Sequence, residues 1–219
     1  MNSTMTLPPS DRTRVRRMAE NARYDRATVH AILDAAYLCH LAFVDAKGPH
    51  CLPMACWREG NQVYIHGSNG GRLVKHLAGG APVCLTVTHL DGLVLARSAF
   101  NHSMNYRSLV VYGQFVPVSD DAHKRALLDR FMRHLAPGRE HEARPGHAKE
   151  LAATTVLGLS LAEAACKVRE GGPFDDDDDL HLPVWTGVLP LALTRGAPQP
   201  DPACKLPAPA YVTAWTAGA

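Results

Sequence analysis

The sequence predicts a mainly β protein, a small antiparallel β-barrel with flanking helices. Short apolar segments alternate with turns such as Lys47-Gly48 and Glu59-Gly60, a pattern typical of antiparallel hairpins. Residues 83–88 alternate between apolar and more polar side chains, as a half-buried strand requires. Helical periodicity is confined to a few stretches, so strands must supply most of the core.

The first half of the chain alternates between helix and strand patterns. A helix begins at Asp25 or Thr28, either of which can cap it, and carries an apolar stripe from Val29 to Tyr37. Residues 40–67 then predict three strands joined by the two turns named above. Residues 70–80, "GGRLVKHLAGG", predict a short helix closed by glycines.

The second half continues the strand pattern and ends in a tail. Residues 82–99 predict a hairpin that turns at Asp91-Gly92, and "YRSLVVYGQFVPV" predicts a long strand with Gly113 as a bulge. A helix over residues 121–135 and a strand over residues 154–161 follow. We predict three regions: an N-terminal arm, one barrel domain and a C-terminal Pro-rich extension, over residues 1–24, 25–190 and 191–219.

Composition narrows the classes of function. The chain has 219 residues, 46% of them hydrophobic, and a net charge of +2 with acids and bases intermixed. This balance gives no electrostatic argument for nucleic acid. No apolar run approaches the roughly 20 residues that span a bilayer. The N-terminus lacks the apolar core of a secretion signal, so we expect a cytoplasmic protein without nucleic-acid or membrane partners.

Cysteine, histidine and aspartate patterns do not predict a metal site. The six cysteines form no C-x-x-C pair, and we expect free thiols. "HEARPGH", residues 141–147, differs from the H-E-x-x-H zinc motif. The run Asp175 to Asp179 either binds a cation or forms a solvated acidic loop, and the loop is the simpler interpretation.

The segment "VYIHGSNGGRLVKHL", residues 63–77, combines features that suit a phosphate group. A helix start offers unpaired N–H groups and a partial positive charge. Gly70 and Gly71 allow close backbone approach, Ser68 offers a hydroxyl, and Arg72 can bind a phosphate. A plain strand-to-helix turn before a solvated basic helix explains the same residues, and the spacing is not that of a P-loop.

Seven segments in a fixed order resemble a known family, the pyridoxamine 5'-phosphate oxidase-like FMN-binding split barrels. The resemblance is strongest to the flavin-nucleotide-binding branch that includes nitroimidazole-resistance proteins. The matching segments run from about Ile32 to Pro190 and read "ILDAAYLCHLAFVD", "GPHCLPMACW", "VYIHGSNGGRL", "NYRSLVVYG", "LAATTVLGLSL", "AACKVREGGP" and "PVWTGVLP".

The resemblance implies a six-stranded antiparallel split β-barrel that forms a homodimer with two FMN molecules at its interface. It places the phosphate at the turn after the third strand and on neighbouring strand residues. The residues it implies as cofactor-binding are Pro53, Met54, His66, Gly67, Ser68, Arg72, Arg107, Ser108, Lys167, Arg169 and Trp185, with the last three approaching from the partner subunit. His66 is also the candidate catalytic residue, because related proteins place a histidine beside the flavin.

The function implied is that of a flavin-dependent oxidoreductase acting on a small molecule such as a nitroaromatic or quinone, with electrons from NAD(P)H. Two alternatives stay open. The chain is either a non-catalytic FMN-binding protein, or a split barrel that binds or degrades heme through one of its histidines, with His66, His76, His89 and His102 as the candidates. FAD is the alternative flavin.

Two departures argue against oxidation of pyridoxamine phosphate itself. The oxidase carries a Ser-Arg-Lys cluster where this chain has "GRL", Gly71 to Leu73. The oxidase also ends in a substrate-binding Arg-Leu-x-Pro segment, whereas this chain ends in "YVTAWTAGA".

Overall fold

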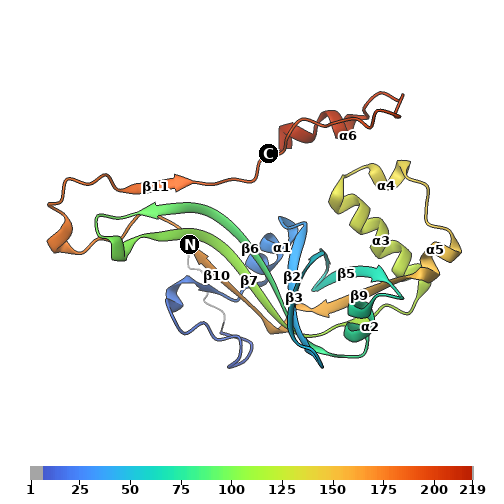
Figure 1. Ribbon diagram of the computed structural model, residues 1–219, viewed down its shortest axis with the longest axis horizontal. Coiled ribbons are helices and arrows are strands. Elements are labelled where there is room, and N and C mark those ends of the chain that lie inside the picture. Colours follow the sequence, from blue (N-terminus) through green and yellow to red (C-terminus); the bar gives the residue numbers. More distant parts are fainter. Residues whose placement is uncertain (1–6, 219) are drawn as a thin grey trace.

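The computed structural model describes residues 7–218 and confirms a mainly β fold with antiparallel sheets (Figure 1). Strands make up 35% of the chain and helices 28%. One sheet has seven strands in the order β1-β10-β7-β6-β2-β3, with β11 on β6. The second has the order β4-β5-β9-β8.

The strands of the first sheet are β1 (Ala22–Arg23), β2 (Leu38–Asp45), β3 (Gly48–Ala55), β6 (Pro82–Leu95), β7 (Ser103–Gln114), β10 (Ala164–Arg169) and β11 (Gly187–Pro190). Those of the second are β4 (Trp57–Glu59), β5 (Gln62–Ser68), β8 (Val116–Pro117) and β9 (Thr154–Ser160). The α-helices are α1 (Arg26–Asp34), α2 (Arg72–Ala78), α3 (Asp121–Leu135), α4 (Arg139–Glu142), α5 (Ala148–Ala153) and α6 (Ala210–Thr213).

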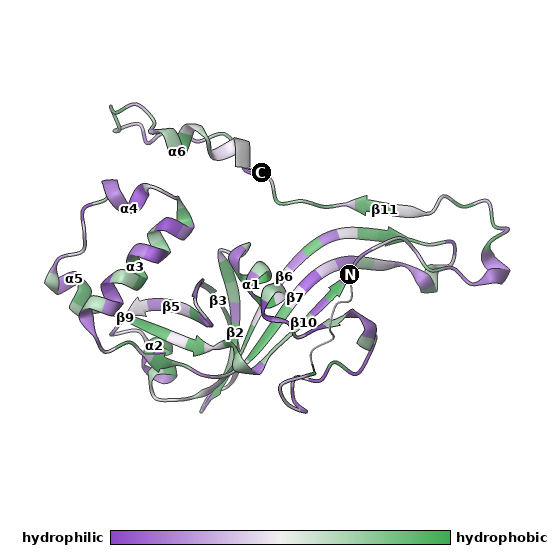
Figure 2. Cartoon of the chain, turned by 180° about the vertical axis from the view of Figure 1, so that it is seen from behind, coloured by the Kyte–Doolittle hydropathy of each residue, from purple (hydrophilic) through white to green (hydrophobic). Residues whose placement is uncertain are grey.

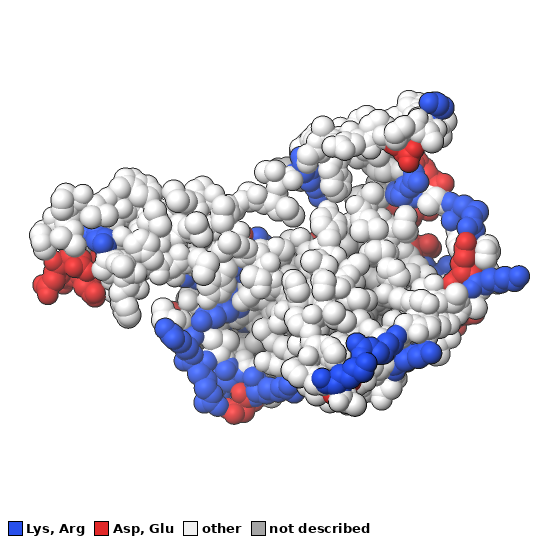
Figure 3. All heavy atoms as spheres, in the orientation of Figure 1, with Lys and Arg blue, Asp and Glu red and all other residues white. Residues whose placement is uncertain are grey.

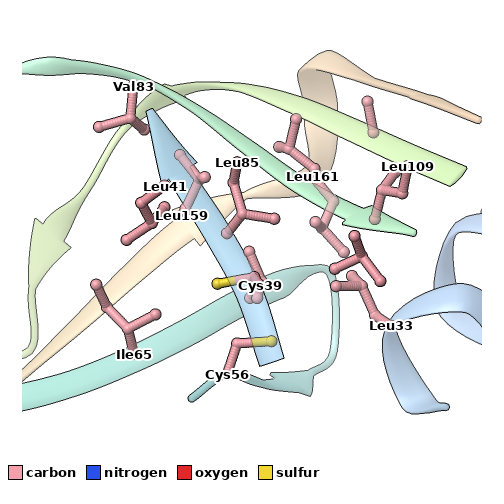
Figure 4. Close-up of a cluster of buried hydrophobic side chains, with 14 of the residues drawn as sticks. Leu33, Cys39, Leu41, Cys56, Ile65, Val83, Leu85, Leu109, Leu159 and Leu161 are labelled. Carbon is pink, nitrogen blue, oxygen red and sulfur yellow. The ribbon is translucent and has the colours of Figure 1, made fainter. Parts of the chain in front are cut away.

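The main core lies between the two sheets and α1 (Figures 2 and 4). Alternate residues of β2 point inward, so that Cys39 and Leu41 are fully buried while their neighbours are more exposed. Leu85, Leu109 and Leu159 meet them from β6, β7 and β9. Each of these leucines contributes roughly 1.5–3 kcal/mol on burial.

A second, smaller cluster lies between the other face of the four-stranded sheet and α3. Trp57, Tyr64 and Val156 face Leu127 of the helix. The bounds of α3 are those that the sequence predicts, and the Asp120 side chain caps it by accepting a hydrogen bond from the His123 amide. α3 therefore covers this face of β5, the strand that carries His66.

The predicted turn at Asp91-Gly92 is wrong. β6 runs unbroken from Pro82 to Leu95, and only its pairing register with β7 shifts between Leu90 and Gly92. Residue 92 must lack a side chain for another reason. An added Cβ there would lie 2.9 Å from Val188 Cγ1 and 3.1 Å from the Leu189 carbonyl oxygen. It makes room for β11, which pairs with β6 there.

The predicted bulge at Gly113 is also wrong. Gly113 lies opposite Val83 in a regular part of the β6–β7 ladder. An added Cβ at residue 113 would come within 2.8 Å of Leu159 Cδ1, which belongs to the facing sheet. The glycine lets the two sheets approach closely, a requirement that is invisible in the local pattern.

The predicted strands over residues 40–67 form, but as four rather than three. Glycines at positive φ make the two predicted turns, with φ of 109° at Gly48 and 58° at Gly60. The chain passes from one sheet to the other at Cys56, whose amide donates to the Tyr37 carbonyl. β3 and β4 are therefore separate strands.

The two ends of the chain add to the sheet. The first six residues of the predicted N-terminal arm lie outside the described residues, but the rest of the arm contains β1, which pairs with β10. At the other end, β11 continues into an extended segment that reaches α6, next to α4 (Figure 1). No helix among residues 7–218 has the length and apolar character needed to cross a membrane.

Candidate functional site

The turn between β5 and α2 is exposed and rich in hydrogen-bond donors. β5 ends at Ser68, and α2 begins after Gly71, which offers no side-chain cap to the first amides of the helix. An added Cβ at Gly67 would lie 2.6 Å from Val74 Cγ2. Strand and helix approach this closely because residue 67 has no side chain.

Hydrogen bonds within the turn fix its shape. The Ser68 carbonyl accepts from the Gly71 amide at 2.9 Å, and the Ser68 hydroxyl oxygen accepts from the Gly70 amide at 3.3 Å. The Asn69 amide donates to the Ala153 carbonyl at 3.0 Å. The Ser68 hydroxyl hydrogen is left available to an anionic ligand, as a phosphate site requires.

Arg72 extends from the start of α2 towards Asp45. Its Nη1 lies 3.3 Å from Asp45 Oδ2, and the arginine side chain is 59% exposed. The same carboxylate accepts from His50 Nε2 at 2.8 Å and from the Lys47 amide at 2.7 Å, and these hydrogen bonds hold the pKa of Asp45 below its usual range. Because Asp45 has other partners, Arg72 can turn to a phosphate without leaving a bare carboxylate.

His66 faces the aromatic cluster beneath α3. Its ring lies 4.8 Å from that of Phe131 and 5.8 Å from that of Trp57, measured between centroids. Nδ1 is buried and has no hydrogen-bond partner among the described residues. Burial lowers the pKa of His66, so the imidazole is neutral near pH 7.

His66 differs in this respect from the other three histidines considered as heme ligands. His76 and His89 each donate Nε2 to a backbone carbonyl, of Val44 and Ile32 respectively. Each keeps only Nδ1, the nitrogen next to the backbone, for a metal. His102 donates Nδ1 to the Ser98 carbonyl and is exposed.

Arg107 and Ser108 lie on β7, in the other sheet, away from the turn. Arg107 makes a bidentate ion pair with Asp91 of β6, at 2.9 Å from Nε and 2.8 Å from Nη2. The Ser108 hydroxyl donates to the Lys167 carbonyl at 3.2 Å. The guanidinium of Arg169 donates to the side-chain oxygen of Asn105 and to the carbonyl of Gly172.

The expected flavin residues thus form two groups within one chain. His66, Gly67, Ser68 and Arg72 share the β5–α2 turn, whereas Arg107, Ser108, Lys167 and Arg169 share the β7–β10 pair. Three residues lie outside both groups. Pro53 and Met54 sit on β3, an edge strand of the sheet, and Trp185 is 63% exposed in the C-terminal segment.

Two hollows flank Arg107. The smaller, about 270 Å³, lies between Arg107 and Thr28 of α1. The larger, about 600 Å³, lies between the end of α1, β6 and the segment after β11. Its lining includes Tyr37, which the sequence placed in an apolar helical stripe, and Arg195. The sequence patterns did not single out Arg195, because it lies in a tail without helical or strand periodicity.

Comparison with known proteins places the chain in a family. The family model described as pyridoxamine 5'-phosphate oxidase matches residues 25–168. The chain belongs to the pyridoxamine 5'-phosphate oxidase family. No curated protein matches the chain.

Two solved members of the family are similar over nearly the whole chain. The flavocytochrome Anf3 from Azotobacter vinelandii is 46% identical, with a TM-score of 0.90, and the match covers 95% of this chain and 98% of that one. The FAD and heme binding protein from Mycobacterium smegmatis is 37% identical, with a TM-score of 0.85, and the match covers 90% of this chain and 97% of that one.

A third member of the family shares the fold alone. A 5-nitroimidazole antibiotic resistance protein from Bacteroides thetaiotaomicron is 22% identical, with a TM-score of 0.56. That match covers 67% of this chain and 86% of that one. The expected membership of the oxidase-like family is therefore confirmed, and flavin binding is supported at the level of the family.

Proposed function

We propose that the chain is a flavin- and heme-binding redox protein, with FAD as its flavin. The observation that carries the proposal is the 46% identity to a flavocytochrome over 95% of the chain, together with the similarity to a protein that binds FAD and heme. The resemblance found in the sequence implied FMN, and the relative named for FAD and heme binding shifts the proposal to FAD.

The β5–α2 turn supports the flavin part. Ser68 would donate its hydroxyl hydrogen, the first amides of α2 would donate their N–H groups, and Arg72 would supply positive charge to the phosphate next to the ribityl chain. These groups orient and hold the flavin. The bound flavin supplies hydride or electron transfer, and the bound heme supplies single-electron transfer.

His66 supports the heme part. It is a neutral imidazole, and no hydrogen bond from a described residue occupies either ring nitrogen. A neutral imidazole is a common axial ligand of heme iron. Phe131 and Trp57 surround the ring and would keep water from it. His66 would then be an iron ligand rather than a catalytic acid or base.

The cofactors are tested by reconstitution and by their visible spectra. The purified protein, supplied with FAD and hemin, should show both the two-banded flavin spectrum and a sharpened Soret band, and extraction should return FAD. If the bound flavin supplies electron transfer, a nicotinamide donor should bleach the flavin bands. Protein that binds neither cofactor would refute the proposal, and binding of a flavin without heme would restrict it to a flavoprotein.

A homodimer is part of the proposal. Large apolar side chains are exposed along the projecting strands β6, β7 and β11. They include Leu93 (36% exposed), Met104 (50%) and Leu189 (45%). In Figure 3 the surface over β11 is largely uncharged, and acidic residues gather at the tip, where Asp175 binds Arg97. Exposed apolar patches of this kind mark association surfaces, and we propose that a second copy of the chain covers this one.

Such a dimer would allow Lys167, Arg169 and Trp185 of one copy to approach the flavin of the other. Leu93 and Met104 are cross-strand partners, so Leu93→Asp and Met104→Asp should shift the mass measured by light scattering towards the monomer. Val116→Asp is the control, because Val116 is 66% exposed but lies on β8, which is not one of these three strands. A wild-type protein that is monomeric at high concentration would refute the dimer.

A further inference from the structure

The segment after β11 carries an arginine to the wall of the 600 Å³ pocket. Arg195 Nη2 lies 3.5 Å from Tyr37 Oη, and the guanidinium carbon lies 4.4 Å from the centroid of the Trp215 ring. A guanidinium over an aromatic face is attracted to the ring but keeps its charge. Both neighbours of Arg195 are neutral, so they position the side chain without neutralising it.

The other charges around this pocket are compensated. Asp91 pairs with Arg107. Asp34 makes a bidentate pair with Arg58 at 2.8 and 2.7 Å. Arg195 has no carboxylate partner among residues 7–218. The pocket therefore carries one uncompensated positive charge, which favours a ligand with a carboxylate or phosphate group.

Tyr37 connects this pocket with the aromatic cluster around His66. The ring of Tyr37 lies 5.2 Å from that of His134, whose Nε2 donates to the Ala36 carbonyl at 2.8 Å. One turn earlier on α3, the ring of Phe131 lies 4.8 Å from that of His66. Residues three apart on a helix share one face, so the same face of α3 covers both His66 and Tyr37.

The backbone also places Tyr37 near the strand that carries His66. The Cys56 amide donates to the Tyr37 carbonyl at 3.3 Å, and the next residue, Trp57, pairs with Tyr64 of β5. Tyr37 and β5 are therefore about two strand spacings apart, roughly 10 Å. A porphyrin ring with its propionate side chains can cover a span of this order.

The cations nearer to His66 are already paired. Arg130 and Arg133 lie on α3, next to the residue that contacts the His66 ring. Arg130 pairs with Glu59 at 3.5 Å, and Arg133 pairs with Glu140 at 2.5 Å. Either would have to leave its carboxylate to bind another anion, whereas Arg195 would not.

The segment that carries Arg195 is not part of the family core. The family model ends at residue 168, and the match to the nitroimidazole-resistance protein covers only 67% of the chain. The matches to the flavocytochrome and to the FAD and heme binding protein cover 95% and 90%. Most of the segment after residue 169 must lie within these two matches, so it accompanies similarity to the two proteins that support heme binding.

We propose that Arg195 binds a propionate carboxylate of the heme whose iron His66 would ligate. The inference rests on the proposed heme binding and deepens it by naming the residue that holds the charged edge of the porphyrin. The propionates are the two carboxylates of heme, and a planar guanidinium binds a carboxylate through two parallel hydrogen bonds. The cluster of Trp57 and Phe131 suits the apolar ring but offers the propionates no cation.

The test compares the dissociation constants of hemin and hemin dimethyl ester, measured by Soret titration of the full-length chain. The ester keeps the iron and the ring, but its propionates are uncharged. The wild type should bind hemin more tightly than the ester. Arg195→Ala should weaken hemin binding about ten- to hundredfold, the range expected for loss of a charge-assisted contact, and leave binding of the ester unchanged.

Two further variants separate charge from packing. Arg195→Lys keeps the positive charge and should retain most of the affinity for hemin. Lys205→Ala is the control, because it removes an exposed tail cation that does not line this pocket, and it should change neither dissociation constant. The Soret maximum should be the same in the wild type and in Arg195→Ala, because His66 would still ligate the iron.

Two outcomes would overturn the inference alone. One is hemin affinity that depends on His66 but is unchanged in Arg195→Ala. The other is an equal loss of hemin and ester in Arg195→Ala, which would mean that Arg195 only holds the C-terminal segment in place. A wild-type protein that binds no hemin would instead refute the heme part of the proposed function together with this inference.

Discussion

Arg107 and Asp91 form a bidentate ion pair between adjacent strands, at the point where the register of β6 and β7 shifts. The two side chains are 37% and 34% exposed, so solvent screens the attraction. The hydrogen bonds from Arg107 hold the pKa of Asp91 below its usual range. Arg107 lines both hollows, and in this structure its charge is compensated by Asp91.

Replacing Asp91 with Asn should therefore lower the free energy of unfolding by about 0.5–1 kcal/mol near pH 7. Since the folded-state pKa of Asp91 is depressed, its contribution is present above the unfolded-state value of about 4 and is lost as pH falls towards the folded value. Urea unfolding from pH 7 to pH 3 should show the wild type and Asp91→Asn converging at low pH. A difference that stays constant over this range would contradict the ion-pair account.

Gly67 should not tolerate a side chain. An alanine Cβ would meet Val74 Cγ2 at 2.6 Å, which forces β5 and α2 apart. We expect Gly67→Ala to cost about 1–3 kcal/mol of unfolding free energy, the usual range for overpacking. Adding Val74→Ala should restore part of this loss, and non-additivity in the double mutant measured by chemical denaturation would locate the clash at this contact.

Arg72 should matter equally for FMN and for FAD. FMN and FAD share the phosphate next to the ribityl chain, so Arg72→Ala should weaken both about ten- to hundredfold. The free energy of unfolding should change little, because the Arg72 side chain is 59% exposed. Lys75→Ala, another exposed cation on α2, is the matched control. Unchanged dissociation constants for both flavins in Arg72→Ala would remove this residue from the site.

Local pattern was sufficient where one element determines the structure. The apolar stripe and the Ala-Pro-Gly sequence after Leu135 gave the bounds of α3, and the glycines after His66 gave the turn before α2. Local pattern failed where distant segments meet. Gly92 faces β11, nearly 100 residues further along the chain. No turn propensity encodes such a contact.

The same contrast between local pattern and contacts of distant segments applies to the candidate site. The β5–α2 turn is a continuous stretch, so its residues were found together in the sequence. The pairing of Arg107 with Asp91 depends on strand register, and the contact of Arg195 with Tyr37 depends on how an extended tail crosses the sheet. A tail without periodic apolar residues gives no register by which residue 195 could have been placed beside Tyr37.

His66 offers the sharpest separation of structural and functional roles. Its buried Nδ1 lacks a hydrogen-bond partner within residues 7–218, so His66→Phe should leave the free energy of unfolding of the cofactor-free protein unchanged or raise it by about 1 kcal/mol near pH 8. Because burial lowers the folded-state pKa below the ordinary value of 6.5, the unfolded chain takes up a proton first as pH falls. The wild type should therefore lose stability below about pH 6.5 relative to His66→Phe.

The His66→Phe variant should lose the Soret band of bound heme while keeping its flavin spectrum. His123→Phe, at an exposed position on α3, should keep both. Full heme binding by a folded His66→Phe protein would exclude His66 as the iron ligand.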